Sequence, residues 1–235
     1  MRTTDLISVF DFDTRQEAMD AAAAIGDCAW VKAGLQLFTR CGPDLVRELQ
    51  DRGKRVFLDL KLHDIPNTVA NAARAIADLG AGMTTVHAGG GSAMVSAACR
   101  AVEGSETRVL AVTILTSLSD EVLTAELGLR ERAAEAVARL ARLAVDAGAH
   151  GIVCSPLEIA AVRDAVGPEP LIVTPGVRPT WAGRDDQARV MTPGDAARAG
   201  ADYVVVGRPI FKDPDPAQAV QRILRELADA ASVEE

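Results

Sequence analysis

The sequence predicts a single-domain α/β protein, a (β/α)₈ or TIM barrel, and three observations support this fold class. Eight short β-branched or apolar runs alternate with Ala-rich amphipathic stretches along the whole chain. The length of 235 residues suits one such barrel. Gly80, Gly148 and Gly200 each end an amphipathic stretch just before the next apolar run, as short helix-to-strand turns require. We therefore expect residues 1–235 to form one domain.

The expected strands are short apolar runs bounded by turn residues. They are Leu6–Phe10, Cys28–Lys32, Arg55–Leu60, Met83–His87, Arg108–Thr113, His150–Cys154, Leu171–Thr174 and Tyr203–Val206. The expected helices place apolar side chains at helical spacing. They are Arg15–Ile25, Pro43–Arg52, Ile65–Leu79, Ser92–Val102, Arg130–Ala147, Pro156–Val166, Thr192–Ala199 and Pro216–Ala231. A doubly wound open sheet is the alternative, but the sequence has no G-x-G-x-x-G after the first strand.

Composition restricts the partners that the chain could bind. A net charge of −8 disfavours nucleic acid, whose phosphates attract clustered Lys and Arg, but it permits a small phosphorylated ligand. No apolar run reaches membrane-spanning length, and the N-terminus lacks the apolar segment of a signal peptide. The four cysteines form no CxxC pair, which favours free thiols. We expect a soluble cytoplasmic protein with no membrane and no nucleic-acid partner.

The segment Phe57–Pro66, FLDLKLHDIP, is unusually charged for a barrel strand. With a period of two, its leucines share one face, while Asp59, Lys61 and His63 share the other. Because a barrel strand is covered on both faces, these charges are expected to point into the barrel and pair near its C-terminal mouth. A structural Asp–Lys pair in an exposed antiparallel strand is the alternative. A lysine held by acidic neighbours stays protonated and can donate a proton in a fixed direction.

Other charged residues fall near the ends of the expected strands. Asp64 is out of phase with its strand, so it either caps the turn or reaches sideways. Asp11 follows the first strand, whereas Asp13 is a competing candidate that could equally cap the first helix. Lys32 ends the second expected strand. These positions place polar groups at the end of the barrel where active sites are built.

Two segments near the C-terminus predict a phosphate site. Gly207 and Arg208 follow the eighth expected strand, and the loop at 175–191, which carries Arg178 and Gln187, follows the seventh. In barrels these two turns commonly bind phosphate through backbone N–H groups, with arginine as a clamp. The loop is roughly three times the usual length, which is typical of a binding loop. A disordered surface insertion is the alternative.

The sequence resembles the orotidine 5′-phosphate decarboxylase family. FLDLKLHDIPNTV matches the family signature D-x-K-x-x-D with its following Ile-Pro-x-Thr. Further matches, in order along nearly the whole chain, are WVKAGLQLF, TVHAGGG, AVTILTS, VTPGVRP, DDQARV and VVVGRPI. The resemblance implies a carboxy-lyase that converts orotidine 5′-monophosphate to uridine 5′-monophosphate in pyrimidine biosynthesis, with no metal and no cofactor.

The resemblance also implies residue roles. Lys61 would protonate C6 of the pyrimidine as the carboxylate leaves, and Asp59 would face that carboxylate. Lys32 would connect these charged residues, the catalytic array, to the ribose. Asp64 would complete the catalytic array from the partner subunit of an obligate homodimer, together with Thr68. The remaining substrate-binding residues would be Asp11, Thr116, Arg178, Gln187, Gly207 and Arg208. The first strand reads Val-Phe-Asp where the family usually has Ala-Leu-Asp, so the choice between Asp11 and Asp13 stays open.

Two other functions are compatible with parts of this sequence. A Mg²⁺-dependent sugar-phosphate decarboxylase or aldolase on a similar barrel would use a carboxylate at the end of strand two, where this chain has Lys32, a cation that repels metal. His63 and His87 show no metal-ligand spacing. A catalytically silent nucleotide-binding protein is the third hypothesis, but a simple binder does not need closely spaced buried charges.

Overall fold

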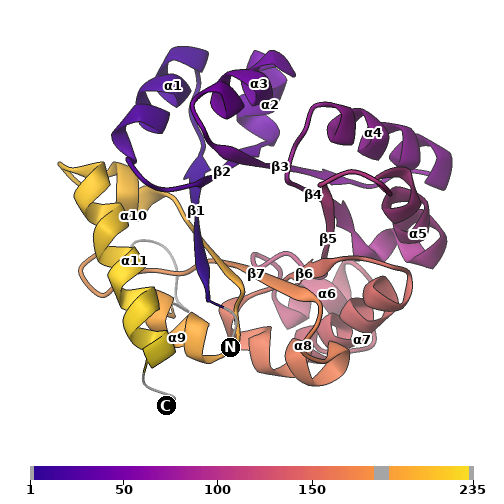
Figure 1. The fold of residues 1–235 in the computed structure, drawn as a ribbon. Coiled ribbons are helices and arrows are strands. Elements are labelled where there is room, and N and C mark those ends of the chain that lie inside the picture. Colours follow the sequence, from indigo (N-terminus) through magenta and orange to yellow (C-terminus); the bar gives the residue numbers. More distant parts are fainter. Residues whose placement is uncertain (1–2, 183–190, 233–235) are drawn as a thin grey trace.

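The structure, a computed structural model, describes residues 3–182 and 191–232. Eight parallel strands form a closed barrel in chain order, and the last strand pairs with the first (Figure 1). The helices surround this barrel as an outer ring. The predicted TIM barrel is therefore confirmed, and the open sheet is excluded. The assignment of all 235 residues to one domain stays a prediction.

The strands are β1 (Asp5–Phe10), β2 (Trp30–Gly34), β3 (Arg55–Leu62), β4 (Met83–His87), β5 (Arg108–Val112), β6 (Gly151–Val153), β7 (Leu171–Pro175) and β8 (Tyr203–Val206). The first helices are α1 (Arg15–Ala24), α2 (Leu35–Cys41), α3 (Asp44–Asp51), α4 (Pro66–Asp78), α5 (Gly91–Ala101) and α6 (Asp120–Ala125). They are followed by α7 (Ala133–Asp146), α8 (Ile159–Val166), α9 (Pro193–Arg198), α10 (Arg208–Phe211) and α11 (Pro216–Ser232). Two short 3₁₀ helices, η1 (Ala88–Gly90) and η2 (Pro156–Glu158), precede α5 and α8.

Local sequence explains where the helices begin and end. The Thr14 side chain accepts the Glu17 N–H and the Glu17 carboxylate accepts the Thr14 N–H, which is a capping box at the start of α1. Gly80, Gly148 and Gly200 have φ values of 76°, 98° and 101° after α4, α7 and α9. Glycine adopts this left-handed conformation without a steric penalty, so the predicted helix-ending glycines are confirmed.

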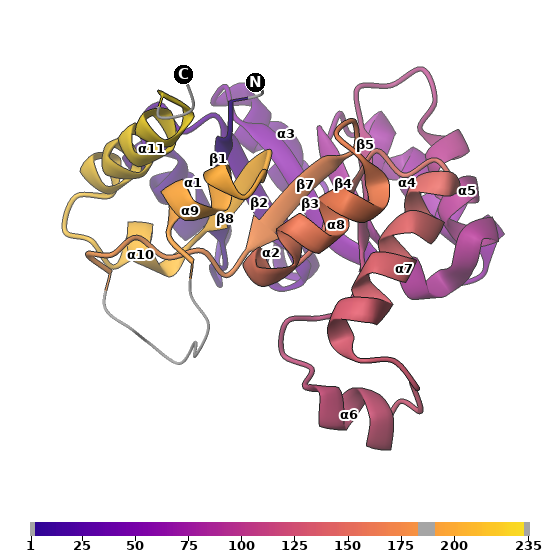
Figure 2. The same ribbon diagram turned by 90° about the horizontal axis from the view of Figure 1, so that it is seen from below.

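Two helices were not expected from the sequence. They are α2 and α6, which contain seven and six residues, so each is too short to show a clear apolar period. Figure 2 shows α6 projecting away from the barrel on a long connection. The predicted bounds of the second strand were also wrong. Because β2 runs from Trp30 to Gly34, Lys32 lies in its middle rather than at its end.

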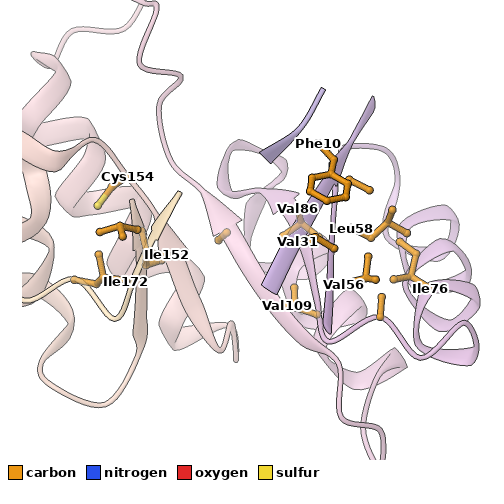
Figure 3. Packing of buried hydrophobic residues seen from close by; sticks show 14 of the residues in the cluster. Phe10, Val31, Val56, Leu58, Ile76, Val86, Val109, Ile152, Cys154 and Ile172 are labelled. Carbon is orange, nitrogen blue, oxygen red and sulfur yellow. The ribbon is translucent and has the colours of Figure 1, made fainter. Parts of the chain in front are cut away.

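The apolar residues form two clusters on the two sides of the barrel wall. Outward-facing strand residues pack against the helices, as Val56 and Leu58 do near Ile76 of α4 (Figure 3). Seven inward-facing residues fill the barrel interior, and they are Ile7, Trp30, Phe57, Met83, Leu110, Val173 and Val205. Each fully buried large apolar side chain contributes roughly 1.5–3 kcal/mol. This filling closes the lower barrel and leaves the C-terminal mouth for polar groups.

The free-thiol prediction is confirmed for all four cysteines. Burial raises the pKa of Cys28 to about 11 and that of Cys154 to about 12, so both thiols stay protonated and behave as small apolar side chains. Within residues 3–182 and 191–232, none of the helices has the length and apolar character needed to cross a membrane.

Candidate active site

Three charged side chains from two neighbouring strands meet inside the mouth of the barrel. The Lys61 ammonium donates to both carboxylate oxygens of Asp59, at 2.9 and 2.8 Å. The Lys32 ammonium lies 3.2 Å from Asp59 Oδ2. Asp59 is only 7% exposed, so the carboxylate is compensated by two cations rather than by water. The expected pairing of inward-pointing charges is confirmed.

The backbone of β3 is distorted at the lysine. Lys61 has a φ of +50°, and the pairing of β3 with β4 shifts register between Leu58 and Leu62. A non-glycine residue in this region costs roughly 1–2 kcal/mol and is retained only where neighbouring contacts enforce it. The strict alternation assumed for this strand therefore ends before Lys61, and the bulge aims the ammonium back at Asp59.

Thr85 of β4 contacts both the backbone of Lys61 and the carboxylate of Asp59. Its hydroxyl accepts the Lys61 backbone N–H at 2.8 Å and donates to Asp59 Oδ1 at 2.8 Å. The side chain thus satisfies the N–H that the bulge releases from the strand ladder and fixes the carboxylate. Sequence reasoning missed Thr85. The available signal was a hydroxyl on the inward face of β4, two residues before the strand end.

The electrostatics keep the central carboxylate ionised. Burial alone would raise the pKa of Asp59, but the Lys32 and Lys61 ammonium groups, with hydrogen bonds from Lys61 and Thr85, lower it below the usual value. A carboxyl whose pKa is lower in the folded state stabilises the fold at pH values above the ordinary carboxyl range. That contribution is lost as the pH falls through the lowered pKa.

We expect Asp59→Asn to destabilise the protein at neutral pH by about 2 kcal/mol, because two partly buried ammonium groups lose their counter-charge. The difference in melting temperature from the unaltered protein should narrow as the pH is lowered from about 5 to about 3. Asp44→Asn is the matched control, since Asp44 pairs with Arg47 on an exposed helix surface and such pairs contribute little. A difference in melting temperature between Asp59→Asn and the unaltered protein that does not change with pH would contradict the lowered pKa of Asp59.

Asp11, rather than Asp13, lies beside the charged cluster. A Cβ placed on Gly34 would lie 3.1 Å from Lys32 Nζ and 3.6 Å from Asp11 Oδ1, so both polar groups reach the same small space. Asp13 instead accepts a hydrogen bond from Gln36 at 2.8 Å and pairs with Arg40 at 3.1 Å. Asp13 is also not the cap of α1, a position that Thr14 occupies.

The two histidines at the ends of β3 and β4 stack on each other. His63 was expected to share the inward face of β3, but the strand ends at Leu62 and His63 is exposed. Its ring lies 5.4 Å from that of His87. Burial, followed by the nearby His63 and Lys61, lowers the pKa of His87, so His87 adds no positive charge beside Lys61 near neutral pH. Across the part of the chain that is described, no group of three or more His, Cys, Asp or Glu side chains could hold a metal ion.

Three predicted site residues are exposed rather than joined to the cluster. Asp64 accepts the N–H of Ile65 at 2.7 Å. It does not cap α4, whose N-cap is Ile65. Thr68 lies in the first turn of α4, and Thr116 lies on the connection after β5; both are exposed. Within the described residues of one chain, the ion pairs of the cluster join only Lys32, Asp59 and Lys61.

The predicted phosphate residues come from two neighbouring strands. Gly207 is the N-cap of α10, and a Cβ there would lie 2.9 Å from Val9 Cβ, so only glycine fits against β1. Arg208 is exposed and begins α10. Arg178 follows β7 and is 6% exposed, with its backbone N–H bonded to Met191 O at 2.9 Å. Gln187 lies outside the described residues.

The sequence matches a known protein family over most of its length. The model of the orotidine 5′-phosphate decarboxylase / HUMPS family matches residues 4–223. An orotidine 5′-phosphate decarboxylase of Anaeromyxobacter sp. (strain K) is 56% identical over 219 residues, which cover 93% of this chain and 96% of that protein. The enzyme of the same name from Opitutus terrae is 50% identical over 226 residues, or 95% of this chain and 98% of the relative.

A solved structure agrees with these sequence relatives. The crystal structure of orotidine 5′-phosphate decarboxylase from Lactobacillus acidophilus has a TM-score of 0.85 and 39% sequence identity to this chain. The match covers 96% of this chain and 99% of the solved one. Sequence and fold therefore agree over nearly the full length of both proteins. This chain belongs to the orotidine 5′-phosphate decarboxylase / HUMPS family.

Proposed function

We propose that this chain decarboxylates orotidine 5′-monophosphate to uridine 5′-monophosphate, with Lys61 as the proton donor and with no metal or cofactor. The observation that best supports this proposal is the Asp59 carboxylate held between the ammonium groups of Lys32 and Lys61 at the barrel mouth. Membership of the family and an identity of 56% to a decarboxylase add to this support.

The chemistry requires stabilisation of a carbanion. The bond between C6 and the carboxylate breaks, carbon dioxide leaves, and the electron pair stays on C6 without a π-system aligned to delocalise it. The Lys61 ammonium stabilises this charge and then transfers a proton to C6, after which the amine regains a proton from solvent. At about 4 Å and an effective dielectric near 20, the electrostatic contact is worth roughly 4 kcal/mol.

That energy is too small to account for so difficult a reaction, so binding of the rest of the nucleotide must help. In this proposal Asp59 fixes both lysines and faces the substrate carboxylate, whose negative charge it repels. Lys32 and Asp11, which converge on the space beside Gly34, bind the ribose hydroxyls. Thr116 contacts the edge of the pyrimidine.

The phosphate is proposed to bind at the ends of β7 and β8, the latter of which pairs with β1. Arg178, Gly207 and Arg208 follow the two strands where barrels commonly hold phosphate, and they supply cations and backbone N–H groups there. Gln187 is assigned to the same group from the sequence pattern alone. Together these contacts would orient C6 against Lys61.

We also propose that the active unit is a homodimer in which Asp64 and Thr68 enter the partner subunit's site. Both side chains are exposed in the single chain, and Ile65 between them is 66% exposed. An exposed apolar side chain beside polar residues suits a contact between subunits. The cytoplasmic location, and the absence of nucleic-acid and membrane partners, stay predictions.

A Mg²⁺-dependent decarboxylase or aldolase acting on a sugar phosphate is the second candidate. Lys32 stands near the place where such an enzyme needs a carboxylate ligand, and its ammonium lies 3.2 Å from Asp59, so it competes with a cation there.

An ultraviolet assay on orotidine 5′-monophosphate with excess chelator separates these candidates. We expect full decarboxylation in chelator and no change on adding Mg²⁺. Loss of activity in chelator with rescue by Mg²⁺ would favour the second candidate, and absence of turnover under both conditions would contradict the proposed reaction.

A further inference from the structure

The described part of the loop after β7 is anchored to the last helix of the barrel. The guanidinium carbon of Arg222 in α11 lies 3.9 Å from the centroid of the Trp181 ring. Trp181 is 37% exposed, so the ring lies against the guanidinium while part of it remains in solvent. Such a stack combines cation–π attraction with packing of planar groups. Trp181 follows the proposed phosphate ligand Arg178 by three residues.

The same guanidinium also holds the segment that follows β8. Arg222 Nη2 donates to the Asp213 carboxylate, and that carboxylate accepts the backbone N–H of Asp215 at 3.0 Å. Asp213 comes two residues after α10, which begins at the proposed phosphate ligand Arg208. In Figure 1, α10 and α11 lie next to each other beside β1. Arg222 therefore contacts both segments that carry the proposed phosphate site.

We propose that Arg222 is a positioning residue for phosphate binding, which sets the spacing between the loop after β7 and the turn after β8 through Trp181 and Asp213. It acts through these two residues and is not proposed to touch the substrate. This inference rests on the proposed function, because the phosphate is part of that substrate. It adds a residue from the outer helical ring to a site otherwise built from strand ends.

The helix that carries Arg222 does not depend on this contact for its place in the fold. Val220, Ile223 and Leu227 on the buried face of α11 are 0%, 0% and 3% exposed. Their burial keeps the helix on the barrel. Replacing Arg222 is therefore expected to leave the barrel folded while it releases the two segments.

The test compares Arg222→Met with Arg225→Met, which removes an exposed arginine one turn further along α11. We expect Arg222→Met to raise KM for orotidine 5′-monophosphate about tenfold with little change in kcat. The inhibition constant of uridine 5′-monophosphate should rise by the same factor, whereas that of uridine, which lacks the phosphate, should stay unchanged. Arg225→Met should match the unaltered protein in all these constants.

A second variant keeps the test decisive if Arg222→Met folds poorly. Trp181→Ala changes a partly exposed loop residue and should raise KM in the same way but by a smaller factor, because the pair between Arg222 and Asp213 remains. The double variant should match Arg222→Met, because that variant already lacks the contact with Trp181. Three results would overturn the inference: additive effects of the two substitutions on KM, unchanged KM values, or an equal rise in the inhibition constants of uridine and uridine 5′-monophosphate. Failure of the unaltered protein to decarboxylate the substrate would instead contradict the proposed function.

Discussion

Lys61→Ala should reduce kcat/KM for orotidine 5′-monophosphate by about 10⁴-fold or more. In the proposed mechanism this variant loses the proton donor, a contribution of roughly 10²–10⁴, and the cation facing the developing charge, roughly 10²–10³ for a single group. The ammonium is already within 2.9 Å of both Asp59 oxygens, so its position is set before substrate arrives. Steady-state decarboxylation, followed by ultraviolet absorbance, measures the loss.

Two further variants separate charge from proton transfer. Lys61→Arg keeps a cation beside Asp59, but a guanidinium releases a proton very poorly, so we expect activity far below the unaltered protein with better substrate affinity than Lys61→Ala. Arg47→Ala removes an exposed cation of α3, away from the proposed site, and serves as the control for altered net charge. Near-normal turnover by Lys61→Ala would eliminate Lys61 as the donor.

The barrel could be predicted because its determinants are local and repeated. Each strand is a short apolar run, and residues such as Gly80 and Gly148 adopt the left-handed turns that their sequence context predicted. The closure of β8 onto β1 follows once eight such units are present. The short α2 and α6 could not be predicted, since a helix of two turns or fewer leaves no distinct period.

The site could be predicted only where the period-two alternation of a strand coincides with charged residues on its inward face. Alternation placed Asp59 inside the barrel, and its partners are the two lysines that the sequence singled out. The left-handed backbone of Lys61 and the bridging role of Thr85 depend on the register between β3 and β4. Register is a tertiary property, so neither feature is encoded in a single strand. Separating Asp11 from Asp13 likewise required the contacts of Gly34 and Arg40.

The exposed position of Asp64 predicts that replacing this residue also lowers kcat/KM strongly. In the single chain its carboxylate bonds only to the adjacent Ile65 N–H among the described hydrogen bonds, whereas Lys61 pairs with Asp59. If Asp64 completes the partner subunit's site, Asp64→Asn alone should lower kcat/KM by at least about a hundredfold, because a charge next to the reacting groups is lost. The variant should fold normally, since the side chain is exposed.

If the proposed homodimer forms, mixed dimers of two inactive variants decide whether the site is shared between subunits. A dimer of one Lys61→Ala subunit and one Asp64→Asn subunit has one doubly altered site and one intact site, because each intact residue comes from a different chain. Random reassortment should restore about one quarter of the unaltered activity. The matched control mixes Lys61→Ala with Asp59→Asn, which lie in the same strand and site, so no intact site can form. No recovery with Asp64→Asn would place Asp64 in its own subunit's site. Recovery in the control would contradict the placement of Asp59 and Lys61 in one site.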